Sequence, residues 1–247
     1  MVNFGDDRRA TLSESVADYL KAMYRLAEAH GAAGTRSTTP ARVGTQEIAD
    51  DLGVSPASAS RMLVKLARTG LVEHEPYHGA SLTPAGERAV LEVIRHHRLL
   101  ETFLHEKLGY RLDEVHAEAE RLEHHISKAF AARIDEALGR PTVDPHGDPI
   151  PAPEGAALRA ENMPLPALAD VSEGGRFRIG RVPSADAAQV RYLDRLGLLP
   201  GAEGEVVEQI PFGGGVRLRV SSGGTERVIG TDLARGIRVT VQSPTDR

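Results

Sequence analysis

The sequence contains no cysteine among its 247 residues. This absence excludes disulfide bonds, thiolate nucleophiles and cysteine-based zinc fingers. Tryptophan is absent too, and aromatic residues make up only 4% of the chain. Any metal ion bound by this protein must therefore be held without thiolate ligands.

Long hydrophobic runs are also missing, since no segment approaches the ~18 consecutive apolar residues that a membrane helix needs. The first ten residues are polar, carry Asp6 and Asp7, and do not resemble a secretory signal. Charged residues make up 26% of the chain. We therefore expect a folded, cytoplasmic protein of two or three small domains without a membrane partner.

Acidic residues are missing from one stretch, Gly53 to Val72, although the formal net charge of the whole chain is −5. The same stretch contains Arg61, Lys65 and Arg68. The net charge argues against nonspecific coating of nucleic acid. A local basic stretch still suits a small DNA-reading module, because the electrostatic footprint of such a module is local.

The residues around this stretch predict a winged helix-turn-helix. We expect a helix over 45–52 with Thr45 as its N-cap, a tight turn at Gly53, and a second helix capped by Ser55. The segment 71–83 is predicted to form a two-stranded wing. In this motif the second helix enters the major groove. The alternative is a helical hairpin that makes only protein contacts.

The candidate DNA contacts are small or hydroxyl-bearing residues at the starts of the two helices, mostly of the second, together with nearby basic side chains. They are Thr45, Ser55, Pro56, Ala57, Ser58, Ser60, Arg61 and Lys65.

Two further helices are predicted, one over 84–108 and one over 113–138 capped by Asp113. On the second of these, Glu120, Glu123 and His124 are spaced i, i+3 and i+4 and therefore share a face. Such a set of carboxylates and imidazole suits a hard divalent cation. The remaining candidates are His116, one turn earlier, and the pair His97 and Glu101 on the preceding helix. The alternative is a solvated helix face.

The last third of the chain changes character. The stretch 141–166 contains seven prolines and is expected to be a linker over the surface. Five short Val/Ile-rich segments separated by Gly turns follow, with a helical insertion over 185–196.

The predicted fold is mainly α with a β tail that forms a small β-barrel. The predicted domains are 1–83, which reads DNA, 84–151, which is helical, 152–169, the linker, and 170–247, the β tail.

Several motifs resemble the diphtheria toxin repressor/manganese transport regulator family. They are Asp18–Tyr24, the helix-turn-helix from Gln46 to Val72, His97–Glu101, Val115–His124 and the segment Pro145–Pro151. The resemblance is strong over residues 12–151. The tail, including Leu196–Gly201, is similar to the SH3-like, FeoA-type domain of the longer family members.

The resemblance implies two metal sites, a helical dimerisation domain and an SH3-like C-terminal domain. The primary site would use Asp18, Glu120, Glu123 and His124. The ancillary site would use His97, Glu101 and His116, with Asp186 and Gln189 added from the tail.

The resemblance also bears on the metal. Iron-responsive members carry Met and Cys where this chain has Asp18 and Glu120, whereas manganese-responsive members carry Asp and Glu. Mn²⁺ is therefore the expected cofactor, with Fe²⁺ as a second candidate, and Zn²⁺, Co²⁺, Ni²⁺ or Cd²⁺ as substitutes in vitro. Lys21 stands where short manganese regulators place a carboxylate that supports a two-manganese site, which argues against that arrangement here.

The implied function is a homodimeric, Mn²⁺-activated repressor that binds palindromic double-stranded DNA operators of metal-uptake genes. The main alternative is a metal-independent winged-helix regulator that answers a small organic ligand. A metal-dependent hydrolase is a third class, but the sequence shows no nucleophile elbow, phosphate loop or dedicated general base. We therefore expect no enzymatic activity and no catalytic residues.

Overall fold

The computed structural model describes residues 12–32, 41–75, 77–153, 165–221 and 223–242. The core of the predicted loop 31–44 and most of the predicted linker 152–169 lie outside these ranges. The chain divides into two compact units. The first comprises residues 1–96, 122–126 and 151–157, and the second comprises 97–121, 127–150 and 158–247.

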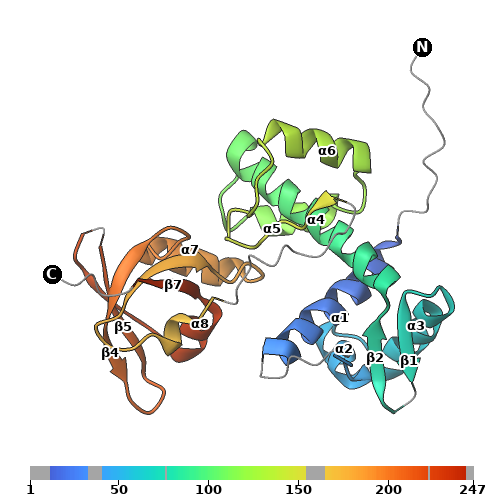
Figure 1. The fold of residues 1–247 in the computed structure, drawn as a ribbon, viewed down its shortest axis with the longest axis horizontal. Helices are drawn as coiled ribbons and strands as arrows, with labels where there is room; N and C mark the ends of the chain where they lie inside the picture. Colours follow the sequence, from blue (N-terminus) through green and yellow to red (C-terminus); the bar gives the residue numbers. More distant parts are fainter. Residues whose placement is uncertain (1–11, 33–40, 76, 154–164, 222, 243–247) are drawn as a thin grey trace. The chain divides into compact units, whose positions relative to one another are not determined.

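The first unit is a winged helix-turn-helix. Three helices, α1 (Glu14–Ala32), α2 (Thr45–Asp51) and α3 (Pro56–Arg68), lie beside the hairpin of β1 (Val72–Glu75) and β2 (Gly79–Leu82) (Figure 1). The start of α4 (Pro84–Leu108) completes the unit. Its core is centred on side chains at most 1% exposed, among them Leu20, Met23, Ile48, Leu63 and Leu66.

The local signals for the two helices of the motif are mostly confirmed. Gly53 has φ +63° and forms the turn, and the Ser55 hydroxyl accepts a hydrogen bond from the Ser58 N–H at 3.2 Å. The prediction that Thr45 caps α2 is wrong. Gly44 is the N-cap, and its N–H donates to the Glu47 carboxylate at 2.7 Å. A glutamate that reaches back in this way makes a capping hydroxyl unnecessary.

Gly86 lies where the start of α4 approaches the end of the motif. A Cβ atom at this position would lie 2.0 Å from the Leu71 carbonyl oxygen. We therefore expect Gly86→Ala to lower the free energy of unfolding by about 1–3 kcal/mol, because overpacking outweighs the gain in helix propensity. Urea denaturation measures this change. The exposed neighbour Arg88 supplies the control, since Arg88→Ala should stay within about 0.5 kcal/mol of the wild type. Equal stability of the two variants would contradict the close approach.

The second unit contains the rest of α4, most of α5 (Val115–Leu122), and α6 (Lys128–Ala137). The prediction of one continuous helix over 113–138 is wrong, because the chain turns between Leu122 and Ser127. The Ser127 hydroxyl accepts from the Phe130 N–H at 3.2 Å and so starts a new helix. Asp113 does not act as the predicted cap. Its carboxylate accepts hydrogen bonds from Arg111 at 2.9 Å and Arg191 at 3.0 Å.

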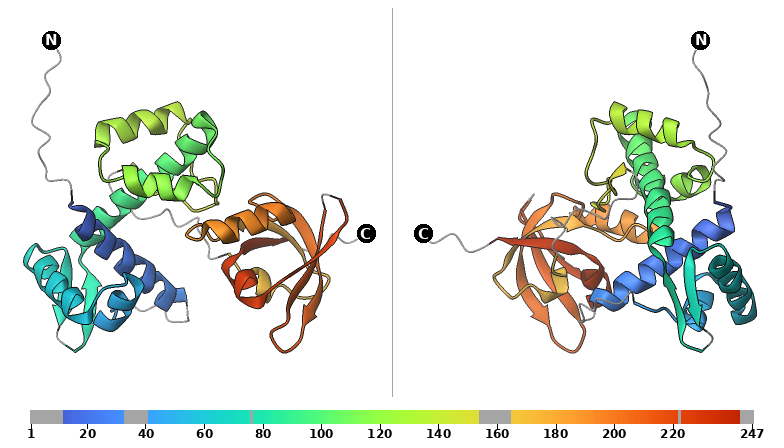
Figure 2. Two further views of the ribbon diagram at one scale, coloured as in Figure 1. Left: turned by 180° about the vertical axis from the view of Figure 1, so that it is seen from behind. Right: turned by 45° about the vertical axis from the view of Figure 1, so that its right-hand side comes forward.

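The five predicted strands form one antiparallel sheet in the order β6-β5-β4-β3-β7. Figure 2 shows this sheet with helices beside it. Their bounds are β3 (Arg176–Arg181), β4 (Glu203–Ile210), β5 (Gly215–Val220), β6 (Glu226–Ile229) and β7 (Arg238–Gln242). Helices α7 (Ala187–Leu196) and α8 (Thr231–Gly236) and a short 3-10 helix, η2 (Leu168–Asp170), accompany the sheet. The core between the sheet and these helices includes the buried side chains of Phe177, Leu193 and Leu218.

Candidate metal centre

In the first unit, helix α1 and the turn after α5 bring three predicted ligands together. The Asp18 carboxylate lies 3.8 Å from His124 Nε2, and that nitrogen lies 3.3 Å from Glu123 Oε1. Because α5 ends at Leu122, Glu123 and His124 lie in the following turn rather than on the predicted helix face.

Burial makes this group suitable for a cation. The side chain of Glu123 is fully buried and that of His124 is 8% exposed. A buried carboxylate needs positive charge nearby, because the loss of hydration otherwise costs several kcal/mol. The Lys21 ammonium, 3.0 Å from Glu123 Oε1, supplies one such charge. Carboxylate and imidazole donors at this place fit a divalent metal ion as well.

In the second unit, the predicted ancillary ligands converge on one carboxylate. His97 Nε2 and His116 Nδ1 each lie 3.0 Å from Glu101 Oε1 and 3.0 Å from each other. Glu120 joins this group, since its Oε2 lies 3.5 Å from His97 Nδ1. Burial alone raises the pKa of Glu101, but hydrogen bonds from His116 and His97 and the charges of His97 and His146 lower it well below its usual range. Glu101 is therefore ionised at neutral pH and available to a cation.

Two further donors come from a turn within the stretch 141–166, which the sequence predicts to be a surface linker. His146 is fully buried and Asp144 is 5% exposed. With Glu101 they form a buried set whose ligand atoms lie within 4.8 Å of one another. The Nε2 atom of His146 lies 3.1 Å from the Leu112 carbonyl oxygen, whereas Nδ1 lies 3.9 Å from Glu101 and makes no hydrogen bond with any described residue.

The burial of His146 predicts an acid-sensitive contribution to stability. Burial lowers the pKa of His146, although the charge of Glu101 partly offsets this effect. As the pH falls below about 6.5, this imidazole takes up a proton more readily in the unfolded state than in the folded state. The free energy of unfolding therefore decreases as the pH falls. In the metal-free protein, the free energy of unfolding of His146→Gln should therefore decrease less steeply with falling pH than that of the wild type, by up to about 1.4 kcal/mol per pH unit. Urea denaturation between about pH 7.5 and 5.5 measures the difference, with the exposed His78→Gln as control. Parallel pH profiles for wild type and His146→Gln would contradict it.

The tail residues expected at the ancillary site lie at the start of α7. The Asp186 carboxylate caps this helix by accepting from the Ala188 N–H at 2.8 Å. Gln189 lies one turn further on and is exposed. Within the described residues, Asp186 belongs to none of the clusters of three His or acidic ligand atoms. Their role at a metal therefore stays a prediction.

The predicted DNA-reading residues gather at the exposed start of α3. Ser55, Pro56 and Ala57 are exposed there. Arg61 is exposed as well, and its guanidinium donates to the Ser58 hydroxyl at 3.0 Å. Ser60 is half-buried and Lys65 is exposed on the following turns, whereas Thr45 is half-buried at the start of α2. The arrangement leaves hydroxyl groups and one guanidinium accessible at a helix N-terminus, which suits phosphate and base-edge contacts.

Three family models match successive parts of the chain. Residues 11–80 match the N-terminal DNA-binding domain of iron-dependent repressors, and residues 83–152 match their metal-binding and dimerisation domain. Residues 167–241 match the FeoA domain.

The chain is 31% identical over 238 residues to the iron-dependent repressor IdeR of Mycobacterium tuberculosis, a match that covers 92% of this chain and 97% of IdeR. The chain belongs to the iron-dependent repressor family. The repressor is also 27% identical over 235 residues to the diphtheria toxin repressor of Corynebacterium efficiens, covering 92% and 96% of the two chains. A solved manganese-dependent transcriptional repressor in complex with manganese is 36% identical, with a TM-score of 0.78 over 92% of this chain and 100% of that one.

Membership of this family confirms the predicted fold class and the general function. The repressor is a metal-dependent transcriptional regulator with a winged-helix DNA-binding domain, a helical domain and a FeoA-type tail. The family consists of transcriptional repressors rather than enzymes. None of the helices in the described part of the chain has the length and apolar character required to span a bilayer. Both iron-dependent and manganese-dependent proteins are among the relatives, so the metal has to be inferred from the ligand set.

Proposed function

We propose that the protein is a cytoplasmic, Mn²⁺-activated repressor that binds palindromic operators of metal-uptake genes as a homodimer. The observation that carries this proposal is the fully buried carboxylate of Glu123 beside His124 and Asp18. The proposed primary ligands are Asp18, Glu120, Glu123 and His124. Among the described helices, those within residues 83–152 are the proposed source of the dimer interface, since this part matches a dimerisation domain.

The choice of Mn²⁺ rests on the donor atoms. Asp18 and Glu120 contribute carboxylate oxygen, and the chain has no cysteine to offer sulfur. Oxygen-rich sets with imidazole suit Mn²⁺, although intrinsic affinity for Zn²⁺, Co²⁺ or Ni²⁺ is usually higher. Fe²⁺ is the second physiological candidate, and the other ions, including Cd²⁺, are expected to substitute in vitro.

The proposed ancillary site is built around Glu101. His97 and His116 contact its carboxylate at 3.0 Å, and the open Nδ1 atom of buried His146 faces it at 3.9 Å. We include His146 and Asp144 as ligands because a buried imidazole nitrogen without a hydrogen bond is an available metal donor. Asp186 and Gln189 remain the proposed contribution of the tail.

Metal and operator are proposed to bind with positive coupling. Asp18, Glu123 and His124 belong to the first unit with the DNA-reading helix, whereas Glu120 belongs to the second. A cation held by Asp18, Glu123 and His124 would fix α1 against the turn after α5, within the unit that carries the DNA-reading helix. Restricted motion of the two recognition helices of a dimer then favours half-sites about one DNA turn, or a multiple of one turn, apart. Linkage requires that the operator raises metal affinity by the same factor.

The deciding experiment measures fluorescence-anisotropy binding to a genomic operator library after metal has been removed by chelation. Sequence-selective binding that appears with Mn²⁺, and weakens in Glu120→Ala, is the expected result. Arg61→Ala serves as a DNA-side control, because it should weaken binding without changing metal affinity. Equal binding in chelator would refute the metal-dependent function and favour a regulator that answers an organic ligand. Activation by Fe²⁺ alone would refute the choice of Mn²⁺.

A further inference from the structure

The turn from Asp144 to Asp148, called the joint below, has a closed internal structure. The Asp144 carboxylate accepts hydrogen bonds from the N–H groups of His146 and Asp148, both at 2.9 Å. The Asp144 N–H donates to the Asp148 carbonyl oxygen at 2.9 Å, and Gly147 has φ +89°. These bonds fix the backbone of the joint independently of its surroundings.

One side of the joint is attached to the helical part of the second unit. The His146 ring is buried between the Leu112 carbonyl oxygen and Glu101. Arg98 of α4 lies 3.7 Å from the Asp148 carboxylate and donates to the Pro149 carbonyl oxygen. The position of the joint is therefore set by the helix that carries the ancillary ligands.

The other side of the joint contacts the end of β3 in the same unit. The Val182 N–H donates to the His146 carbonyl oxygen at 3.0 Å, and Arg181 contacts the Asp148 carboxylate at 3.1 Å. A Cβ atom at Gly147 would lie 1.9 Å from the Gly180 carbonyl oxygen. Only a glycine at 147 allows this approach of the two backbones.

The sheet is adapted to the same contact. The pairing of β3 with β7 shifts register between Ile179 and Arg181, so Gly180 is the extra residue of a β-bulge. A bulge removes its residue from the regular ladder and redirects the neighbouring backbone. Here the redirected carbonyl of Gly180 faces Gly147.

We propose that the joint docks the FeoA-type domain onto the helical domain, and that a cation at the Glu101 cluster strengthens this docking through His146. The second part rests on the proposed ancillary site. His146 belongs to both contacts, since its ring faces Glu101 and its carbonyl oxygen accepts from Val182. A cation that fixes the ring therefore also fixes the peptide that holds the sheet.

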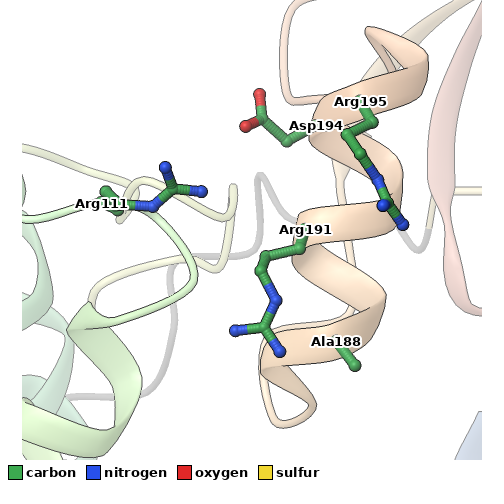
Figure 3. A pocket seen from close by; sticks show the side chains of 5 residues that line it. All are labelled: Arg111, Ala188, Arg191, Asp194 and Arg195. Atoms are coloured by element: carbon green, nitrogen blue, oxygen red, sulfur yellow. The ribbon is translucent and has the colours of Figure 1, made fainter.

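A charged contact beside α7 supports the same docking. Arg191 of α7 donates to the Asp113 carboxylate at 3.0 Å. Arg111 faces this helix across a pocket that Arg191, Asp194 and Arg195 also line (Figure 3). The Asp113 side chain is only 7% exposed, but Arg191 and Arg111 are largely exposed, so salt screens their interaction with it. The buried joint, rather than this rim, is expected to determine the docking.

The docking is tested by single-molecule energy transfer in the metal-free full chain. The sequence has no cysteine, so dyes attach only at the introduced Arg133→Cys and Asp232→Cys, two exposed positions in α6 and α8. Gly147→Ala should shift the transfer efficiency and broaden its distribution. Gly139→Ala is the matched control, because Gly139 has a similar φ of +75° but open space around it.

A distribution for folded Gly147→Ala that equals the wild type would overturn the docking. If circular dichroism shows that Gly147→Ala is unfolded, Arg181→Ala decides, since it removes the contact with Asp148 without backbone strain. An unchanged distribution in Arg181→Ala then overturns the proposal, and a broadened one supports it.

The metal-dependent part is tested by adding Mn²⁺ to the same labelled proteins, with calorimetry to record binding. Mn²⁺ should narrow the distribution in the wild type but not in His146→Gln. Binding of Mn²⁺ that leaves the wild-type distribution unchanged would overturn the coupling alone. Failure of Mn²⁺ to bind would overturn the coupling together with the proposed function, while the Gly147 comparison still decides the docking.

Discussion

Replacement of Asp18 by alanine is expected to leave a folded dimer whose operator affinity no longer rises with Mn²⁺. Asp18 lies on α1 and is 36% exposed, so its removal leaves no large cavity. The buried core of α1, which includes Leu20 and Met23, is unchanged. The substitution removes the one proposed ligand that α1 contributes, and with it the link between metal binding and the position of α3.

The loss should equal the whole coupling between metal and operator, which is typically about 5- to 150-fold in affinity. Anisotropy titrations with and without Mn²⁺ measure it, and size-exclusion chromatography with light scattering checks the dimer. Glu14→Ala is the matched control, because Glu14 is an exposed carboxylate in the first turn of the same helix. Retention of full Mn²⁺ dependence in Asp18→Ala would remove Asp18 from the ligand set.

The DNA-reading motif could be predicted from the sequence because its signals are local. Ser55 and Pro56 start α3, Gly53 makes the turn, and each acts through neighbours fewer than five residues away. Helix α4 likewise begins and ends at the predicted residues, Pro84 and Leu108. Local hydrogen bonds and steric limits determine these boundaries, so the residue types alone indicate them.

The break between α5 and α6 is not predicted from the hydrophobic periodicity, although the sequence contains a local signal for it. The residues from Val115 to Leu138 continue a helical pattern without Gly or Pro, and this favoured one helix. Ser127, however, is a good N-cap, and its hydroxyl accepts from the Phe130 N–H. The apolar periodicity outweighs this capping signal, so the sequence alone predicts Glu123 and His124 on a helix that in the structure ends at Leu122.

The role of the joint was not predictable from local signals. The partners of His146 are Leu112 and Glu101, 34 and 45 positions earlier in the chain, and Val182 on the other side. The prolines around it indicated a linker, and the family resemblance included its motif without giving it a function. Contacts between residues so far apart in the sequence depend on how the whole unit packs. Hydrophobic periodicity and turn signals are local and do not predict such packing.

Replacement of Lys21 by methionine is expected to increase metal affinity and to destabilise the metal-free protein. The Lys21 ammonium lies 3.0 Å from Glu123 Oε1, and the Glu123 side chain is fully buried. In the metal-free protein, the positive charge of Lys21 stabilises the buried carboxylate of Glu123. When a divalent ion binds Glu123, the same ammonium competes for the oxygen and repels the ion.

Methionine keeps most of the length and apolar volume of lysine but removes the charge. A hydrogen bond to a charged group contributes about 1.5–3 kcal/mol. If that energy no longer has to be given up on metal binding, affinity should rise about tenfold to hundredfold. The free energy of unfolding of the metal-free protein should fall by a comparable amount. Calorimetric titration with Mn²⁺ and urea denaturation in chelator measure the two effects separately.

The two effects together identify the mechanism. Lys107→Met, at an exposed position in the last turn of α4, is the control for the general loss of one positive charge. It should change neither quantity appreciably, because exposed charges at a distance are screened by salt. A loss of stability in Lys21→Met without tighter Mn²⁺ binding would show that Lys21 only holds the fold. Opposite changes of stability and affinity would show that the ammonium of Lys21 sets the metal concentration at which the repressor is activated.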